Sequence, residues 1–476
     1  MQTRFVFPAL AALISLTACA INPVTGDRQL ALVSESQEIQ IGRDVATQAE
    51  RQFGLVEDAA LQAYVHRLGS QLAQASERPE LPWTFRVADD PTPNAFAAPG
   101  GFIFITRGLL ALLRNEAELV SILGHEIGHV TARHSVAMMS RAQLAQLGLG
   151  IGSIMSPSVA QFGDLAAGGL QLLFLSYGRD AERQADDLGY RYALEQGYDV
   201  REMVNVFAAL QQSAQLAGQS PVPSWLASHP YPEDRIARIN KRLVTLPAAT
   251  AARRVGEDDY LAQIDGLVYG DNPRDGYFEA NRFLHPELAF RIDFPQGWRT
   301  QNLTQAVVAG SPGEDALIQL MLVPGSLQEA TDAFFAQQGL TAGQVRSQKV
   351  NGLPAMSGSF EAQTEQAKLG GVVTFVALGG RTYRILAYTP AAKRAAYEQV
   401  FRATMNSFAR LTNAAALARQ PQRLAIVRVR RAMTVSEFNQ AHPSAIPLEE
   451  LALINQLAGP QAVMPANFKA KRVVVQ

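Results

Sequence analysis

The stretch that decides the fold of this chain is AELVSILGHEIGHVTARH, residues 117–134. It places His125 and His129 four positions apart, with Glu126 directly after the first histidine. On an α-helix, residues i and i+4 lie on one face, so the two imidazoles point at the same place. Zinc takes imidazole nitrogen at about 2.0–2.1 Å and prefers four ligands. Glu126 is one step around the helix, where it can take a proton from water activated by the metal without being a ligand.

The residues around this motif indicate a buried helix. The alternative is a polar helix face with two solvated histidines. Because buried imidazoles and a buried carboxylate need partners, apolar flanks favour a metal site. Gly128 costs up to about 1 kcal/mol relative to alanine inside a helix, which indicates that a neighbouring backbone or a substrate approaches closely there. The apolar flanking residues are Leu119, Val120, Ile122, Leu123, Ile127 and Val130.

A candidate third ligand lies in RDAERQADDLG, where Glu182 and Asp186 again have the i, i+4 spacing. Glu182 can close the metal site with an oxygen ligand. Asp186 can then accept the other ring N–H of a ligating histidine. The alternative is a solvated helix face of mixed charge, because this stretch also contains Arg179, Asp180, Arg183 and Asp187.

The two stretches together resemble the zinc metalloproteases grouped with the CAAX prenyl proteases, HtpX and Oma1. Members of this family pair an H-E-x-x-H helix with a later E-x-x-x-D helix. The resemblance implies one zinc ion per chain, bound by His125, His129 and Glu182, with Glu126 as the catalytic base. Asp186 matches the family aspartate, which acts as a proton donor or orients a histidine.

Two further stretches match the same family, and the whole resemblance covers roughly residues 25–245. NAFAAPGGFIFI resembles the family's edge strand beside the zinc, so an extended peptide would pair with Asn94, Ala95 and Phe96. The alternative is a simple structural hairpin. SHPYPEDRI resembles a family loop whose histidine approaches the metal. His229 would then plug the fourth ligand position or stabilise the oxyanion, whereas the alternative is a surface loop histidine.

The first nineteen residues, MQTRFVFPALAALISLTAC, have the pattern of a secretory signal peptide. Arg4 precedes an apolar run that is too short for a spanning helix. The end of this segment resembles a bacterial lipobox, in which the peptide is cut before the cysteine and the cysteine receives lipid. Cys19 is the only cysteine of the chain, and a stray cysteine is the alternative. Ala20 follows it, which favours the outer membrane over retention at the inner membrane.

The rest of the chain predicts an α+β multidomain protein. Strand-like alternation begins near residue 280. The C-terminal part resembles LysM folds that bind peptidoglycan, although the Gly-Asp usual before Thr434 is lacking, and a small packing module is the alternative. We expect a signal peptide over residues 1–19, a mainly helical zincin-type protease domain with a small β-sheet over 20–250, a linker over 251–279, an α+β domain of unknown role over 280–412 and a LysM-like module over 413–476.

The composition and the motifs lead to one functional hypothesis and one rival. Lys+Arg is 42 against Asp+Glu 43, so no electrostatic footprint for nucleic acid is present. The resemblance, which includes periplasmic BepA-type proteases, implies a zinc endopeptidase anchored by lipid in the periplasm, at the inner leaflet of the outer membrane. Its expected substrates are misfolded or stalled outer-membrane and periplasmic proteins. The rival is a non-proteolytic chaperone whose zinc is plugged by His229, although an intact Glu126 favours chemistry because a structural site needs no base.

Overall fold

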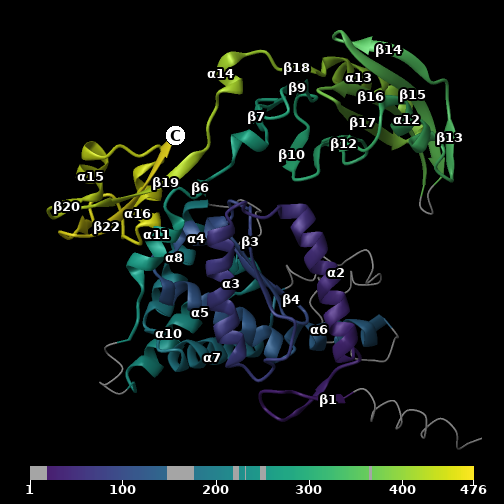
Figure 1. Ribbon diagram of the computed structural model, residues 1–476. Coiled ribbons are helices and arrows are strands. Elements are labelled where there is room, and N and C mark those ends of the chain that lie inside the picture. The colour runs from purple at the N-terminus through teal and green to yellow at the C-terminus, as the bar shows by residue number, and fades with distance from the viewer. Residues whose placement is uncertain are drawn as a thin grey trace, which may run out of the picture. The chain divides into compact units, whose positions relative to one another are not determined.

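The computed structural model describes residues 19–146, 176–217, 225–230, 232–246, 253–363 and 367–475. Apart from Cys19, the predicted signal peptide lies outside these ranges. The chain forms two compact units (Figure 1). The first runs up to Gly270 and resumes with Gln422–Val475, and the second is Asp271–Pro421. Both units combine helices with sheets, so the predicted α+β multidomain class is confirmed.

The first unit is mainly helical up to Gly270. None of its described helices, nor any other described helix of the chain, has the length and apolar composition that crossing a membrane requires. Its elements are β1 (Cys19–Ile21), β2 (Arg28–Leu30), α2 (Glu35–Phe53), α3 (Ala59–Gln74), β3 (Thr84–Ala88), β4 (Ala95–Ala98), β5 (Phe102–Thr106), α4 (Arg107–Leu112), α5 (Glu116–Thr131), α6 (His134–Gln146), α7 (Arg179–Glu195), α8 (Glu202–Ala217), α9 (Trp225–Ser228), α10 (Pro232–Leu243), α11 (Glu257–Ile264) and β6 (Val268–Tyr269).

A small three-stranded sheet with the order β3-β5-β4 belongs to this part of the chain. The central strand β5 runs parallel to β3 and antiparallel to β4, so β4 is an edge strand. Gly100 and Gly101 join β4 to β5 with φ values of 76° and 105°. Glycine adopts such values without steric cost, which explains why the chain can turn at these two residues.

Helix α5, which carries the H-E-x-x-H motif, is buried along its whole length. Asn115 caps it by accepting the backbone N–H of Glu118 through its side chain at 2.9 Å. Glu116 and Glu118 occupy the first turn, where negative charge is stabilised by the helix dipole. The apolar flanks predicted to bury the helix therefore do so.

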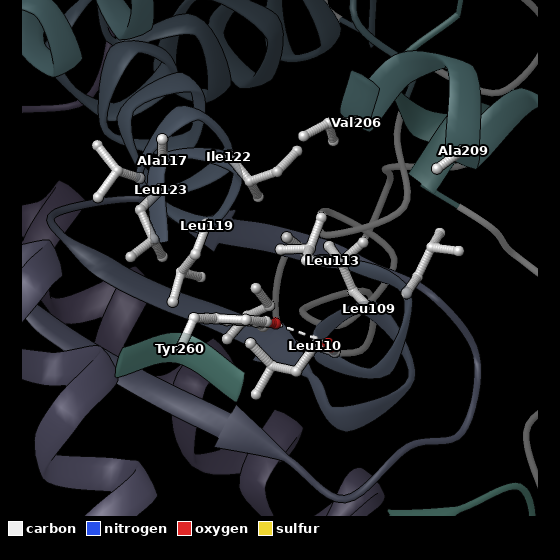
Figure 2. Close-up of a cluster of buried hydrophobic side chains, with 14 of the residues drawn as sticks. Leu109, Leu110, Leu113, Ala117, Leu119, Ile122, Leu123, Val206, Ala209 and Tyr260 are labelled. Atoms are coloured by element: carbon white, nitrogen blue, oxygen red, sulfur yellow. Dashed lines mark hydrogen bonds between the residues drawn. The ribbon is translucent and has the colours of Figure 1, made fainter. Parts of the chain in front are cut away.

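Figure 2 shows the apolar cluster that surrounds the start of α5. Leu119 and Leu123 of α5 belong to this cluster and are 0% exposed. Tyr260 enters the cluster from α11, and its hydroxyl donates a hydrogen bond to the carbonyl of Leu110 at 2.6 Å. Residues 251–279, assigned to a linker from the sequence, thus include a helix that contributes to the core of the first unit.

Helix α7 packs against α5 at short range because three glycines face the contact. A Cβ atom at Gly128 would lie 3.1 Å from the Cα atom of Ala185. A Cβ atom at Gly189 would lie 2.7 Å from the backbone nitrogen of His125, and one at Gly124 would lie 3.0 Å from the Cα atom of Gly189. The close approach expected at Gly128 is therefore that of the α7 backbone, which brings the side chains of α7 beside the two histidines.

The C-terminal residues return to the first unit. The sheet β22-β19-β6 joins them to the strand that precedes the second unit, and their apolar side chains belong to the same core as those of α5. The predicted order of strand, two helices and strand is present, whereas the LysM-like character stays a prediction. The elements are β19 (Gln422–Arg428), β20 (Met433–Thr434), α15 (Val435–Ala441), α16 (Leu448–Ile454), β21 (Val463–Met464) and β22 (Lys469–Val475).

A buried lysine of β22 holds this segment against the end of α4. Lys471 is 0% exposed, and its Nζ donates to the carbonyls of Ala111, Leu112 and Leu113 at 2.7, 3.2 and 2.8 Å. The last carbonyls of a helix lack partners within the helix, so the lysine satisfies groups that would otherwise be buried unpaired. Burial holds the pKa of Lys471 well below its ordinary value.

A second polar contact reaches α5 itself. Gln456 Nε2 donates to Glu118 Oε2 at 2.9 Å. Next to it, the guanidinium of Arg114 lies 4.2 Å from the centre of the Phe468 ring. The C-terminal segment therefore contacts both the start of α5 and the turn that leads into it.

The second unit is built on an eight-stranded sheet with the order β10-β11-β12-β17-β16-β15-β13, in which β14 also pairs with β15. In β16, Val372 and Val376 face one apolar cluster with Phe401 of α13, whereas Val373 faces another with Phe334 of α12, so both faces are covered. The elements are β7 (Tyr277–Glu279), β8 (Arg282–His285), β9 (Phe290–Asp293), β10 (Arg299–Leu303), β11 (Ala306–Gly310), β12 (Leu317–Val323), α12 (Leu327–Phe335), β13 (Leu340–Ala342), β14 (Arg346–Val350), β15 (Leu353–Gln363), β16 (Lys368–Leu378), β17 (Arg381–Pro390), α13 (Arg394–Ser407), β18 (Ala409–Arg410), α14 (Ala414–Leu417) and the short 3-10 helices Pro273–Asp275 and Ala391–Lys393.

Replacing Lys471 by methionine should destabilise the first unit. The Lys471→Met variant keeps the length of the side chain but leaves buried carbonyls unpaired, at a cost of about 1–3 kcal/mol per lost polar partner. The loss in the free energy of unfolding is measured by urea unfolding, monitored by circular dichroism. Lys241→Met, at an exposed position of α10, is the matched control. Equal unfolding midpoints for the two variants would contradict the structural role of Lys471.

Candidate metal centre and active site

Four buried side chains meet beside the α5–α7 contact. His125 and His129 come from α5, Glu182 from α7, and His229 directly follows α9. One donor atom from each lies within 4.8 Å of the donor atoms of the other three. Each of the four residues is 1% exposed. The structure thus brings together the three ligands predicted from the sequence and the loop histidine.

The spacing of these donor atoms suits a small four-coordinate metal ion. His125 Nε2 lies 3.0 Å from His129 Nε2 and 3.2 Å from His229 Nδ1. Glu182 Oε1 lies 3.4 Å from His129 Nε2 and 3.1 Å from His229 Nδ1. A tetrahedron with bonds of about 2.0–2.1 Å has edges of about 3.3–3.4 Å. The three nitrogens and one oxygen therefore have the chemistry and the separations of a zinc site.

The charges around this site also fit a divalent cation. Three carboxylates, those of Glu126, Glu182 and Asp186, are buried with the single guanidinium of Arg235. Glu182 Oε2 accepts no hydrogen bond from any described residue, although Arg235 Nη1 lies 3.0 Å away. Burial lowers the pKa of His229, but Glu182 and Glu126 raise it above its ordinary value overall. Because unpaired buried charge is costly, a doubly charged cation would neutralise the excess.

Asp186 holds the ring of His125. Its Oδ1 lies 2.9 Å from His125 Nδ1, and Arg235 donates to both carboxylate oxygens at 2.8 and 2.6 Å. Burial raises the pKa of Asp186, but Arg235 and His125 lower it below its ordinary value overall. An ionised Asp186 accepts the Nδ1–H of His125 and leaves Nε2 for the metal, which is the geometry of a histidine-orienting residue.

The ring of His129 has neutral neighbours instead. His134 Nδ1 lies 2.9 Å from His129 Nδ1, and His134 Nε2 lies 2.9 Å from Gln184 Oε1. Burial lowers the pKa of His134 to about 4, so its ring is neutral at physiological pH. Tyr177 stacks on His129 with ring centres 4.0 Å apart. Burial also holds the pKa of His129 well below its ordinary value, which suits a ligand that must be neutral.

Glu126 lies beside the donor set. Its Oε1 accepts a hydrogen bond from Trp225 Nε1 at 3.3 Å and lies 3.5 Å from His229 Nε2. Trp225 is fully buried and stacks on His229 with ring centres 4.6 Å apart. Its backbone N–H donates to the carbonyl of Pro93 at 3.3 Å. Trp225 and His229 thus cover the carboxylate that the sequence identifies as the base.

The predicted substrate residues lie on β4 and just before it, outside the donor set. Thr106 N–H donates to the Asn94 carbonyl at 2.9 Å, so Asn94 and Thr106 form a hydrogen-bonded pair. Because such pairs alternate along an antiparallel ladder, the N–H and C=O of Ala95 point away from β5, and those of Phe96 point toward it. Asn94 Oδ1 is buried without a hydrogen-bond partner among the residues that the structure covers.

Several residues of the site were not assigned a role from the sequence. Arg235 lies in the quoted SHPYPEDRI stretch and His134 in the opening one, so both were within the motifs but outside their spacing patterns. Gln184 lies between the two acids of α7. Tyr177 and Trp225 carry no local signal, because their roles depend on contacts between distant segments.

Zinc content should depend on the three predicted ligands and not on Glu126. We expect purified protein to hold one zinc ion, and His125→Ala, His129→Ala and Glu182→Ala to lose stoichiometric zinc because each removes a donor atom. Glu126→Gln should keep it, since its carboxylate lies outside the donor set. Elemental analysis after dialysis measures the zinc stoichiometry, and competition with a chelator measures the zinc affinity. Full stoichiometry and affinity in Glu182→Ala would exclude Glu182 as a ligand.

Comparison with known proteins agrees with this site. Residues 59–243 match the sequence profile of Peptidase family M48. The putative beta-barrel assembly-enhancing protease of Vibrio cholerae is 31% identical over 218 residues, 44% of this chain and 44% of that protein. The beta-barrel assembly-enhancing protease of Escherichia coli (strain K12) is 28% identical over 251 residues, 51% of this chain and 50% of that protein.

A mitochondrial relative shares the same region. The mitochondrial metalloendopeptidase OMA1 of Schizosaccharomyces pombe is 25% identical over 245 residues, 49% of this chain and 68% of that protein. The chain spans about half the length of the beta-barrel assembly-enhancing proteases that it matches. The matched region contains α5 and α7 with all four donor residues. Residues 59–243 are therefore similar to Peptidase family M48, and this region contains a donor set that could hold a metal ion.

Proposed function

We propose that the chain is a zinc-dependent endopeptidase of the bacterial cell envelope that degrades misfolded or stalled outer-membrane and periplasmic proteins. The observation that carries the proposal is the buried set of His125, His129 and Glu182 with Glu126 beside it, within an M48 domain. The envelope role is supported by the relatives named for beta-barrel assembly.

The side chains divide the chemistry between them. When bound, zinc polarises the substrate carbonyl and lowers the pKa of water to about 7. Glu126 would act as a general base and acid, which accepts a proton from the attacking water and donates it to the leaving amine. Trp225 Nε1 holds one oxygen of this carboxylate, at 3.3 Å. Asp186 keeps the proton of His125 on Nδ1, at 2.9 Å.

The substrate would pair with the edge of β4. Because the Ala95 N–H and C=O point away from β5, an extended peptide can add to the sheet there as a further strand. Asn94 and Phe96 flank this residue, and all three are buried in the present structure. Binding therefore requires that the segments covering the site move aside.

His229 is proposed to plug the site at rest. Its Nδ1 lies within the donor set, 3.2 Å from His125 Nε2 and 3.1 Å from Glu182 Oε1. If it binds the metal, the fourth position is filled and no water can be activated there. The alternative function, a non-proteolytic chaperone or assembly factor, corresponds to a plug that is never released.

Cleavage of casein or of an unfolded envelope protein tests these roles. Glu126→Gln should abolish cleavage while retaining zinc, because the base is lost and the donors stay. If His229 is a plug, His229→Ala should raise the rate. If it stabilises the oxyanion, the rate should fall by about 10²–10³-fold. The double variant His229→Ala with Glu126→Gln is the control for contaminating proteases. Absence of cleavage in both wild type and His229→Ala would favour the chaperone, whereas cleavage unchanged in Glu126→Gln would exclude Glu126 as the base.

The proposed location rests on Cys19. We propose that this residue is lipidated and anchors the protein at the periplasmic face of the outer membrane, where the C-terminal segment could also contact peptidoglycan. Cys19 begins β1, which pairs with β2.

Mass spectrometry of the mature N-terminus should find a lipid-modified Cys19. Two or three acyl chains would anchor the protein durably, because a single chain gives only marginal binding. Cys19→Ser should release the protein into the soluble fraction. An unmodified N-terminus at a residue after Cys19 would exclude the anchor.

A further inference from the structure

We propose that His134 and Gln184 are positioning residues of the zinc site, which keep the proton of His129 on Nδ1 and thereby direct its Nε2 at the metal. The inference rests on the metal site of the proposed function. It concerns two residues that lie outside the donor set and outside the H-E-x-x-H and E-x-x-x-D spacing patterns.

The hydrogen-bond geometry carries the inference. Gln184 Oε1 can only accept, so His134 Nε2, 2.9 Å away, carries the proton. As a metal ligand, His129 must keep the lone pair of Nε2 free and so carries its proton on Nδ1, which makes His134 Nδ1 the acceptor. It lies 2.9 Å from His129 Nδ1, which must then be the donor. The lone pair of His129 Nε2 is left free on the side that faces His125 Nε2, 3.0 Å away.

The backbone turn between α5 and α6 places His134 beside His129. Helix α5 ends at Thr131, and Arg133 adopts a φ of 58°, a left-handed conformation that is unfavourable for a residue with a side chain. Arg133 Nε pairs with the buried carboxylate of Glu38 at 2.9 Å, and its Nη2 donates to the carbonyl of Val33 at 3.0 Å. These contacts hold the turn that starts α6 with His134 beside His129.

A neutral pair of residues is suited to this side of the site. Ligating histidines usually donate their other N–H to a carboxylate, a backbone carbonyl or water. A further carboxylate here would add to the three that are already buried at the site, those of Glu126, Glu182 and Asp186. An imidazole whose own N–H is held by an amide oxygen accepts the same hydrogen bond without adding charge. Gln184 and Asp186 thus support the two histidines from the same helix, one through His134 and the other directly.

Two substitutions at one position separate hydrogen bonding from packing. His134→Asn places an amide oxygen close to the position of Nδ1 and can still accept from His129. His134→Leu keeps much of the volume but has no acceptor. Gln184→Leu retains His134 but removes the amide oxygen that keeps the proton of its ring on Nε2. His66→Leu, at an exposed position of α3, is the control.

The measurement is zinc affinity, by competition with a chromophoric chelator, on the purified full chain. We expect His134→Leu to bind zinc about 10–100-fold more weakly, the usual cost of losing such a partner. His134→Asn should remain close to wild type, and Gln184→Leu should fall between. Thermal unfolding of the zinc-free proteins identifies any variant that fails to fold. If His134→Leu fails to fold, the zinc affinities of wild type, His134→Asn and Gln184→Leu still test whether His134 and Gln184 position His129.

Two outcomes would count against the inference. Wild-type affinity in both His134→Leu and Gln184→Leu would show that no positioning is needed. Affinity as low in His134→Asn as in His134→Leu would assign the effect to the ring and its packing. Absence of zinc from the wild-type protein would instead overturn the proposed function, which separates the two failures.

Discussion

The site depends on how closely two helices approach each other. Glycines at positions 124, 128 and 189 leave no room for a side chain between α5 and α7, where a Cβ atom would lie only 2.7–3.1 Å from backbone atoms of the facing helix. This proximity allows Glu182, whose side chain is short, to meet two histidines on a neighbouring helix. A single methyl group inserted in so tight a contact typically costs about 1–3 kcal/mol, and here it would also separate the ligands.

Charge is the second constraint on the arrangement. Glu126, Glu182 and Asp186 are almost completely buried, and the guanidinium of Arg235 pairs with the last two. Arg235 also lies 4.6 Å from the ring centre of Trp225, so the same residue links the acid pair of α7 to the cover of the site. Without a metal ion the cluster would contain excess negative charge in a region closed to water. Folding of this region and metal binding are therefore coupled.

The parts of the site that sequence reasoning predicts are those set by local periodicity. The pairs His125–His129 and Glu182–Asp186 follow from the i, i+4 geometry of a helix, and their meeting follows from the family resemblance. The role of Arg235 could not be predicted from local periodicity, because it depends on ion pairs between α10 and α7. The same limit applies to the C-terminal segment, whose apolar pattern predicts a small core but does not tell which core it joins. Lys471 in particular reads as a surface cation in the run KAKRVVV, whereas it is fully buried.

The return of the chain through β19 makes the second unit an insertion. Tyr269 and Gln422 are register partners on adjacent strands, although residues 270–421 separate them in the sequence. Both attachment points of the insertion are therefore held side by side by the hydrogen bonds of one sheet. Domains attached in this way are commonly gained, lost or exchanged with little effect on the host, because the host strands are already at the correct separation. Another module could thus be placed at this point, in evolution or by design, without any change to the residues of the metal site.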